Sequence, residues 1–210
     1  SVTASNFDVA GVTGEAFAST TAGDTADDAD LYITFADGVL LSDAAPTVSY
    51  TAGSLTDLSG NHLASTGVVA STDAAGPAIL SAVASDATNV VVGIDNDDTV
   101  TLTFSEDIFA APFPVIDATN IDTVLALSGA HSWRDGASAI TSAVWGPANT
   151  LVITLSDTTS DPTVAVADTI STDGTTITDP SGNPSSPAAS PAISGTFTSV
   201  TPPTLIGLTT

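Results

Sequence analysis

The stretch TVTLTFSED (residues 99–107) decides how the chain folds, because its apolar residues fall on every second position. Successive side chains of a strand point to opposite faces, so this alternation predicts a β-strand with one buried face. The stretches LYITFAD (31–37) and TLVITLSD (150–157) repeat the pattern. Further segments are predicted as strands in the same way: PTVSYTA (46–52), AILSAVAS (78–85), AITSAVWG (139–146), PTVAVAD (162–168) and AISGTFTSV (192–200).

Clusters of Gly, Pro, Asp and Asn separate these segments, and strong helix formers such as Lys, Glu and Met are almost missing. Short alternating runs between turn clusters predict an all-β fold, specifically an antiparallel β-sandwich. Apolar residues make up 42% of the chain, which is enough for a packed core and argues against an acidic disordered segment.

Several blocks of sequence occur twice in the same order, which predicts a repeated module. The pairs are SNFD (5–8) with TNID (119–122), LYITFAD (31–37) with LVITLSD (151–157), APTVSYTA (45–52) with DPTVAVAD (161–168), DLSGN (57–61) with DPSGN (179–183), and GPAILSAVAS (76–85) with PPTLIGLTT (202–210). The 99–107 strand has no earlier counterpart. We therefore expect residues 1–75 to be the C-terminal part of one module, 76–200 a complete module, and 201–210 the start of a further module or a linker strand.

Two interpretations of these module boundaries remain open. In the first, the 210 residues are part of a longer array of modules. In the second, residues 201–210 complete the open sheet of a neighbouring chain by strand addition. Either interpretation requires something to cover the unpaired edges of residues 1–75.

The charge of the chain restricts its partners. It has 24 acidic residues, one arginine and two histidines, giving a net charge of −23. Nucleic acid is excluded as a partner because no cationic surface is available for phosphates, and no apolar run is long enough for a membrane span. The chain has no cysteine, which excludes disulfides and thiolate metal sites. Self-repulsion at this charge calls for salt or a bound cation.

The strand end VTLTFSEDI (100–108), TNID (119–122) and the late turn DPSGN (179–183) together resemble the bacterial Ig-like repeats of surface-layer proteins and large calcium-dependent adhesins. The resemblance covers residues 77–200 and, as a partial copy, residues 5–76. It implies tandem Ig-like β-sandwich modules, the first one incomplete at its N-terminal side. It also implies an extracellular, cell-surface location, a structural or adhesive role without catalysis, and frequent dependence on calcium.

Calcium is the cofactor that the sequence favours, because the chain offers almost only oxygen ligands. In a sandwich of this topology the exit of the 99–107 strand and the loop before the last strand lie at the same pole. We therefore expect Glu106 and Asp107 to converge with Asp179 and Asn183. Asp73, in the preceding linker STDAAGP (71–77), is a further candidate ligand, and calcium there would stiffen the joint between modules.

Other acidic positions are weaker candidates. Asp95, Asp97 and Asp98 form a second cluster in GIDNDDTV (93–100), and Asp57 and Asn61 occupy the first copy of the repeated turn. Each has a simpler interpretation, since Asp, Asn and Gly are the ordinary residues of turns. The acidic run GDTADDAD (23–30) is predicted to be a solvated loop.

Nothing in the sequence predicts catalysis. His62 and His131 lie in polar, glycine-containing loops outside any nucleophile or metallopeptidase motif. Trp145 is expected in the core, and Arg134 is expected to pair with a carboxylate. Trp133 is predicted either to pack over the edge of the sandwich or to contact a glycan or protein partner.

These features predict a structural component of a secreted surface array, in which rigid modules stabilised by calcium or salt assemble with copies of themselves or with adjacent modules. The same features are compatible with two alternative functions. The first is an adhesin module that binds a glycan or protein partner through HSWRDG (131–136). The second is an accessory domain of a secreted polysaccharide-degrading enzyme.

Overall fold

The structure is a computed structural model that describes residues 6–17, 32–36, 40–53, 55–86, 93–108, 112–147 and 149–198. The chain divides into two compact units, Ser1–Ala74 and Ala75–Thr210, which we call unit 1 and unit 2. Strands far outnumber helices, which confirms the predicted all-β class. In the described part of the chain, no helix has the length and apolar character needed to cross a bilayer. The acidic run 23–30 and the predicted strand 201–210 lie outside the described residues.

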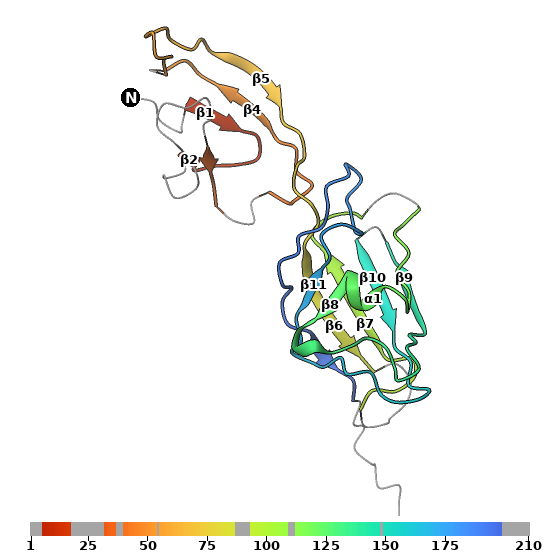
Figure 1. Cartoon of the computed structure of the whole chain (residues 1–210). Helices are drawn as coiled ribbons and strands as arrows, with labels where there is room; N and C mark the ends of the chain where they lie inside the picture. Colours follow the sequence, from red (N-terminus) through yellow and green to blue (C-terminus); the bar gives the residue numbers. More distant parts are fainter. Residues whose placement is uncertain are drawn as a thin grey trace, which may run out of the picture. The chain divides into compact units, whose positions relative to one another are not determined.

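Unit 1 contains two small antiparallel sheets (Figure 1). Strands β1 (Phe7–Val9), β4 (Thr47–Tyr50) and β5 (Thr66–Ala70) form one sheet in the order β1-β4-β5. Strands β2 (Ala16–Phe17) and β3 (Ile33–Thr34) form the other. The predicted strand 46–52 corresponds to β4. Within the predicted strand 31–37, the described residues 32–36 contain the two residues of β3, and β5 was not predicted.

The core of unit 1 is small. Among its described residues, the buried apolar side chains are Val9, Val12 and Tyr50, and the ring of Phe7 lies 4.9 Å from that of Tyr50. All five residues of β5 are exposed. The described sheet of unit 1 therefore buries little apolar surface of its own.

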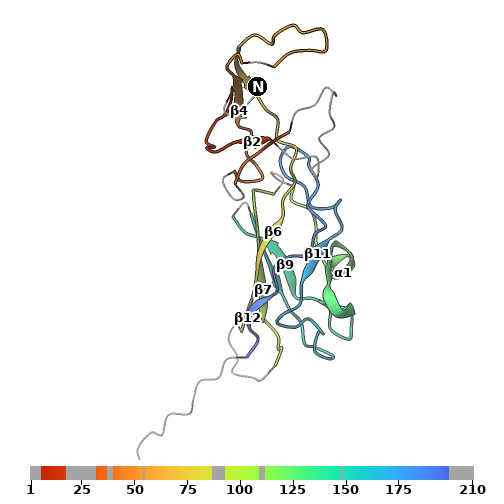
Figure 2. The same ribbon diagram turned by 90° about the vertical axis from the view of Figure 1, so that its left-hand side faces the viewer.

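Unit 2 is built on a five-stranded sheet in the order β12-β6-β7-β10-β9. Figure 2 labels β12, β6, β7 and β9 of this sheet. Its strands are β6 (Ile79–Ser85), β7 (Thr99–Phe104), β9 (Ser142–Trp145), β10 (Thr150–Thr154) and β12 (Ser194–Thr196). Each of these strands lies within a segment that the alternation predicted. The prediction of purely antiparallel pairing is wrong at one edge, where β12 pairs parallel to β6.

The alternation in β7 and β10 places the apolar residues of both strands in the core of unit 2. Val100, Leu102 and Phe104 are fully buried, and the threonines between them are only half-buried. In the antiparallel register Leu102 pairs with Leu151 and Val100 pairs with Ile153, so that both strands present their apolar residues to the same face.

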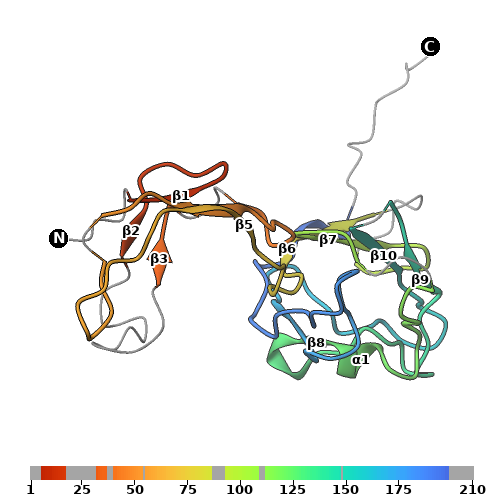
Figure 3. The same cartoon turned by 90° about the horizontal axis from the view of Figure 1, so that it is seen from above.

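A second, smaller layer covers this face (Figure 3). It contains α1 (Ile121–Val124), β8 (Leu125–Leu127), the 3₁₀ turn η3 (Ser128–Ala130) and β11 (Ile170–Thr172), with β8 and β11 paired antiparallel. The sequence predicted none of these elements. The predicted strand 162–168 is wrong, since these residues form a loop and turn, and the block TNID leads into a helical turn whereas SNFD leads into β1.

Both tryptophans are part of the packing of unit 2. Trp133 is fully buried within the core, and its indole N–H donates to the carbonyl of Leu125 at 2.6 Å, so the predicted position at the sandwich edge is wrong. Trp145 packs against the core and stacks on Phe113, as its pattern predicted. Arg134 pairs with Asp122 at 2.7 Å, which confirms the expected carboxylate partner.

Candidate metal centre

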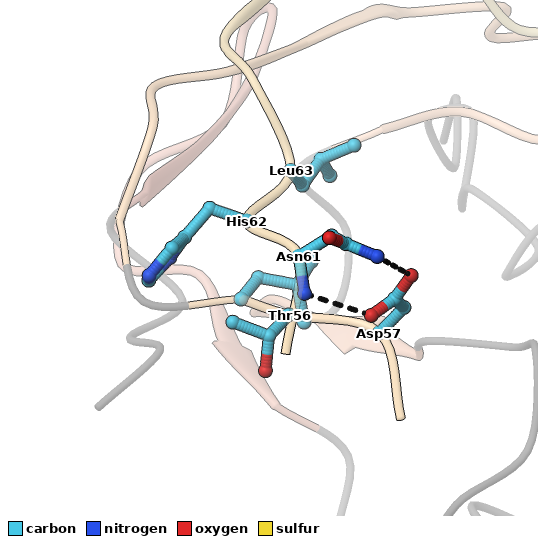
Figure 4. Close-up of a pocket in the computed structure, with 6 residues that line it drawn as sticks. Thr56, Asp57, Asn61, His62 and Leu63 are labelled. Carbon is cyan, nitrogen blue, oxygen red and sulfur yellow. Dashed lines mark hydrogen bonds between the residues drawn. The ribbon is translucent and has the colours of Figure 1, made fainter. Parts of the chain in front are cut away.

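The repeated turn has the same internal geometry in both copies. In unit 1, Asp57 accepts hydrogen bonds from the backbone N–H of Asn61 at 2.8 Å and from its side-chain amide at 2.8 Å. The Asp57 backbone N–H donates in turn to the carbonyl of Asn61 at 3.0 Å. Gly60 adopts a φ of 85°, a left-handed conformation that glycine reaches without strain. Figure 4 shows this turn, with His62 pointing away from the Asp57 carboxylate.

In unit 2, Asp179 accepts from the backbone N–H of Asn183 at 2.8 Å and from its side-chain amide at 2.7 Å. Gly182 adopts a φ of 90°. The two copies differ in burial, because Asp57 is exposed whereas Asp179 is completely buried. The motif therefore specifies a turn in both copies, and only the second copy is positioned to bring its carboxylate into the protein.

The first residues of unit 2 lie beside this buried turn and beside the end of β7. The backbone N–H of Ser105 donates to the carbonyl of Ala78 at 2.8 Å, and the N–H of Ala78 donates to the Ser105 hydroxyl at 2.9 Å. Gly76 approaches the turn so closely that a Cβ atom at this position would overlap the carbonyl oxygen of Pro184. The segment before Ala78 is thereby held next to both Glu106 and Asp179.

Three of the predicted ligands come together here. One carboxylate oxygen from each of Asp73, Glu106 and Asp179 lies within 4.8 Å of the others, and we call these residues the acidic triad. Glu106 is 4% exposed and Asp179 is fully buried, while Asp73, in the segment leading into unit 2, is half-buried. Asp107 points to solvent and is not a member of the triad.

Burial and hydrogen bonding have opposite effects on the pKa of Asp179. Burial raises the pKa of its carboxyl, but hydrogen bonds from Asn183, Gly182 and Ser181 together outweigh burial and hold the pKa below its usual range. Asp179 is therefore ionised at neutral pH. Bringing a second buried carboxyl beside an ionised one is unfavourable unless a proton or a cation neutralises part of the charge.

The chain has little positive charge of its own to offer. Its only Lys or Arg residue, Arg134, is bonded to Asp122. Either Glu106 holds a proton or a cation from solution balances the triad. Each carboxylate oxygen has two lone pairs, so the hydrogen bonds that Asp179 accepts leave lone pairs available for a cation. Carboxylate oxygens fit a hard divalent cation, and calcium accepts such sets with flexible geometry.

The other predicted ligands do not join the triad. Asp57 and Asn61 lie in unit 1, where the Asp57 carboxylate is used by its own turn. The cluster before β7 is divided, since Asp95 and Asp98 are buried whereas Asp97 is exposed and has a φ of 78°. The sequence did not indicate Asp157 as a neighbour of Asp95, because the repeated blocks LVITLSD (151–157) and DPTVAVAD (161–168) predicted strands rather than ligands.

One histidine takes part in a carboxylate network. His131 Nδ1 lies 2.8 Å from Asp168, and the hydroxyl of Ser128 donates to the same carboxylate at 3.1 Å. The serine is therefore bonded to the aspartate rather than to the imidazole, whereas an activated serine nucleophile is bonded to the imidazole. This network ties the 128–131 turn to the 165–168 turn, because Asp168 also accepts from the N–H of Ala165.

No protein-family model, curated protein or solved structure matches this chain. The likeness to bacterial Ig-like repeats therefore rests on the motifs of the sequence.

Proposed function

We propose that the chain is a structural part of a secreted cell-surface array, built from Ig-like β-sandwich modules and stabilised by calcium. The observation that carries the proposal is the acidic triad. It combines a buried pair, Glu106 and Asp179, with Asp73 from the segment that leads into unit 2. A cation bound to all three would hold this segment against the module and offset part of the charge.

The fold supports a mechanical role. Unit 2 has a continuous core between the five-stranded sheet and the smaller layer, and all five residues of β10 are paired with β7. Such a module is rigid, and rigid modules joined by cation-bound linkers transmit force and keep their spacing. The low content of positive charge supports assembly through cations rather than through salt bridges.

The alternative of an adhesin module has less support. It assigned Trp133 in HSWRDG (131–136) as a contact residue for a glycan or protein. The indole is fully buried and bonded to Leu125, and it offers no surface to a partner. Arg134 in the same loop is bonded to Asp122.

The proposal is tested by removing calcium from the chain and following both stability and assembly. With EDTA at fixed ionic strength, we expect a lower Tm and loss of ordered assemblies in electron micrographs, with magnesium a poor substitute for calcium. Binding to the folded form alone adds stability in proportion to ln(1 + [L]/Kd), so the Tm should rise steadily with calcium concentration. A melting curve and an assembly state that chelator leaves unchanged would contradict the proposal.

A further inference from the structure

A second group of acidic side chains gathers where two loops of unit 2 are joined. The turn before β7 and the loop after β10 are connected by hydrogen bonds: the N–H of Asp157 donates to the Asn96 side chain at 2.8 Å, and the N–H of Leu155 donates to the carbonyl of Asp98 at 2.7 Å. The two loops are therefore held side by side, close enough for the carboxyl of Asp95 to act on that of Asp157.

Asp95 is the unusual member of this group. Its side chain is 7% exposed, and neither of its carboxylate oxygens accepts a hydrogen bond from any described residue. Buried polar atoms in native structures almost always have a partner, and a buried ionised carboxylate without one is costly. Its own turn does not meet this need, because the N–H of Asp95 donates to Asp98.

Asp157 and Asp161 supply further negative charge at the same place. Burial raises the pKa of Asp157, and the neighbouring carboxyls of Asp161, Asp95 and Asp135 raise it further. Asp157 is half-buried and Asp161 is exposed. Three carboxyl groups, from Asp161, Asp95 and Asp135, thus act on the carboxyl of Asp157 at this junction.

Asp135 differs from Asp95 because both of its carboxylate oxygens accept hydrogen bonds. One of its oxygens accepts from the hydroxyls of Ser156 and Thr158 at 2.9 and 2.6 Å, and the other accepts from two backbone N–H groups. Hydrogen bonding, above all from Thr158, holds the pKa of Asp135 far below its usual range against the effect of burial. Asp135 therefore fixes the shape of the loop after β10 and keeps its own charge.

We propose that Asp95, Asp157 and Asp161 form a second divalent-cation site of the calcium class, which we call the Asp95 site. A cation would give the buried Asp95 oxygens the partner they need and would relieve the repulsion between Asp157 and Asp161. These oxygens are grouped less tightly than those of the acidic triad. Asp161 is exposed, and its carboxyl lies within hydrogen-bonding reach of that of Asp157.

The Asp95 site is independent of the acidic triad. Asp95 precedes β7 and Glu106 follows it, so the two sites lie at opposite ends of that strand. Six strand residues at about 3.3 Å each separate them by roughly 20 Å, which is beyond the screening length at physiological salt. Each site can therefore be removed without the other.

The test is calcium titration by isothermal calorimetry on the full 210-residue chain, with Glu106→Gln introduced to remove the triad. We expect this variant still to bind about one calcium ion. Adding Asp95→Asn or Asp161→Asn should raise the Kd of the remaining ion on the order of 100-fold. Asp97→Asn, which changes an exposed neighbour in the same turn, is the matched control and should leave the Kd unchanged.

A second readout separates ligation from a purely structural role. Asp95→Asn removes a buried charge, so in chelator its Tm should equal or exceed that of the parent, and only the calcium-induced rise in Tm should be lost. The proposal is overturned if the Glu106→Gln chain binds no calcium, or if both Asp95→Asn and Asp161→Asn leave its Kd unchanged. Because Asp161 is exposed, its variant tests the site even if Asp95→Asn fails to fold. Failure of the surface-array proposal would appear instead as an unchanged wild-type assembly in chelator.

Discussion

A carboxylate oxygen of Glu106 lies within 4.8 Å of a carboxylate oxygen of Asp179, although β8 to β11 separate the two residues along the chain. Both side chains are buried. The fold brings them together because Glu106 follows the end of β7, next to the first residues of unit 2, and Asp179 begins the turn on which those residues lie. This pairing of buried acids is the physical basis for the predictions that follow.

Replacing Glu106 by Gln should abolish the stabilisation by calcium that we propose for the triad. In chelator the variant should be as stable as the parent or more stable, because one of two adjacent buried acids becomes neutral. The measurement is thermal unfolding with and without calcium at fixed ionic strength. Asp107→Asn changes the exposed neighbour and serves as the control. An equal response to calcium in Glu106→Gln and in the parent would contradict the prediction.

Replacing Gly76 by Ala should destabilise unit 2. The added Cβ would overlap the backbone carbonyl of Pro184, which cannot move aside like a flexible side chain. We expect a loss of about 1–3 kcal/mol in the free energy of unfolding, measured by urea denaturation. Gly67→Ala is the control, since nothing lies near the Cβ position at Gly67. Equal stability of the two variants would show that the close approach at Gly76 is unimportant.

The two copies of the turn should respond differently to loss of their asparagine. Asn183→Ala removes the side-chain hydrogen bond to the buried Asp179 and should cost about 1–2 kcal/mol. It should also raise the pKa of Asp179, because fewer hydrogen bonds then counteract the effect of burial. Asn61→Ala should have a smaller effect, because Asp57 is exposed to water. Urea denaturation and NMR titration of the carboxyl groups provide the test, and a larger effect at Asn61 would be inconsistent with the role of burial.

The pH dependence follows from the same hydrogen bonds. The pKa values of Asp122, Asp173 and Asp179 are lowered, in each case because hydrogen bonds outweigh burial. A carboxyl whose pKa is lower in the folded state stabilises the fold above the unfolded value near 3.8, and this contribution is lost as the pH falls through the folded value. We therefore expect the free energy of unfolding to decrease below about pH 4. Stability that keeps rising toward pH 2 would contradict this expectation.

Trp133 should prove to be a core residue. Trp133→Phe leaves the carbonyl of Leu125 without its indole donor and leaves unfilled volume, and it should cost about 2–3 kcal/mol. Any loss of surface attachment by this variant should follow its loss of stability. Attachment that is lost while the unfolding curve stays unchanged would instead favour the adhesin alternative.

The sequence predicted the strands of the main sheet because their alternation is long and regular. β6, β7 and β10 each bury one face, and in β7 and β10 the buried residues follow a period of two without interruption. The smaller layer was missed because its elements have only three or four residues, too few for any period to be visible. The segment 162–168 alternates but lies in a loop whose shape is set by hydrogen bonds to Asp168 and Ser132, and no local pattern reports such long-range contacts.

The candidate sites were predictable to the extent that they depend on strand ends and turns. The grouping of Glu106 with Asp179 follows from topology, and the turn geometry of Asp179 and Asn183 follows from residue type. The difference in burial between Asp95 and Asp97 could not be predicted from the sequence. Residues of the same type in one turn become buried or exposed according to what packs over them. For the same reason Asp157 and Asp161 were not recognised as neighbours of Asp95.

The central claim, that a cation neutralises the buried pair, is tested most directly by crystals grown with calcium and diffraction data collected where calcium scatters anomalously. We expect an anomalous peak coordinated by Glu106, Asp179 and Asp73, with calcium–oxygen distances of about 2.3–2.6 Å. No peak at the triad in saturating calcium, with a Glu106 oxygen instead within about 2.7 Å of an Asp179 oxygen, would show that a shared proton holds the pair together and would contradict the claim.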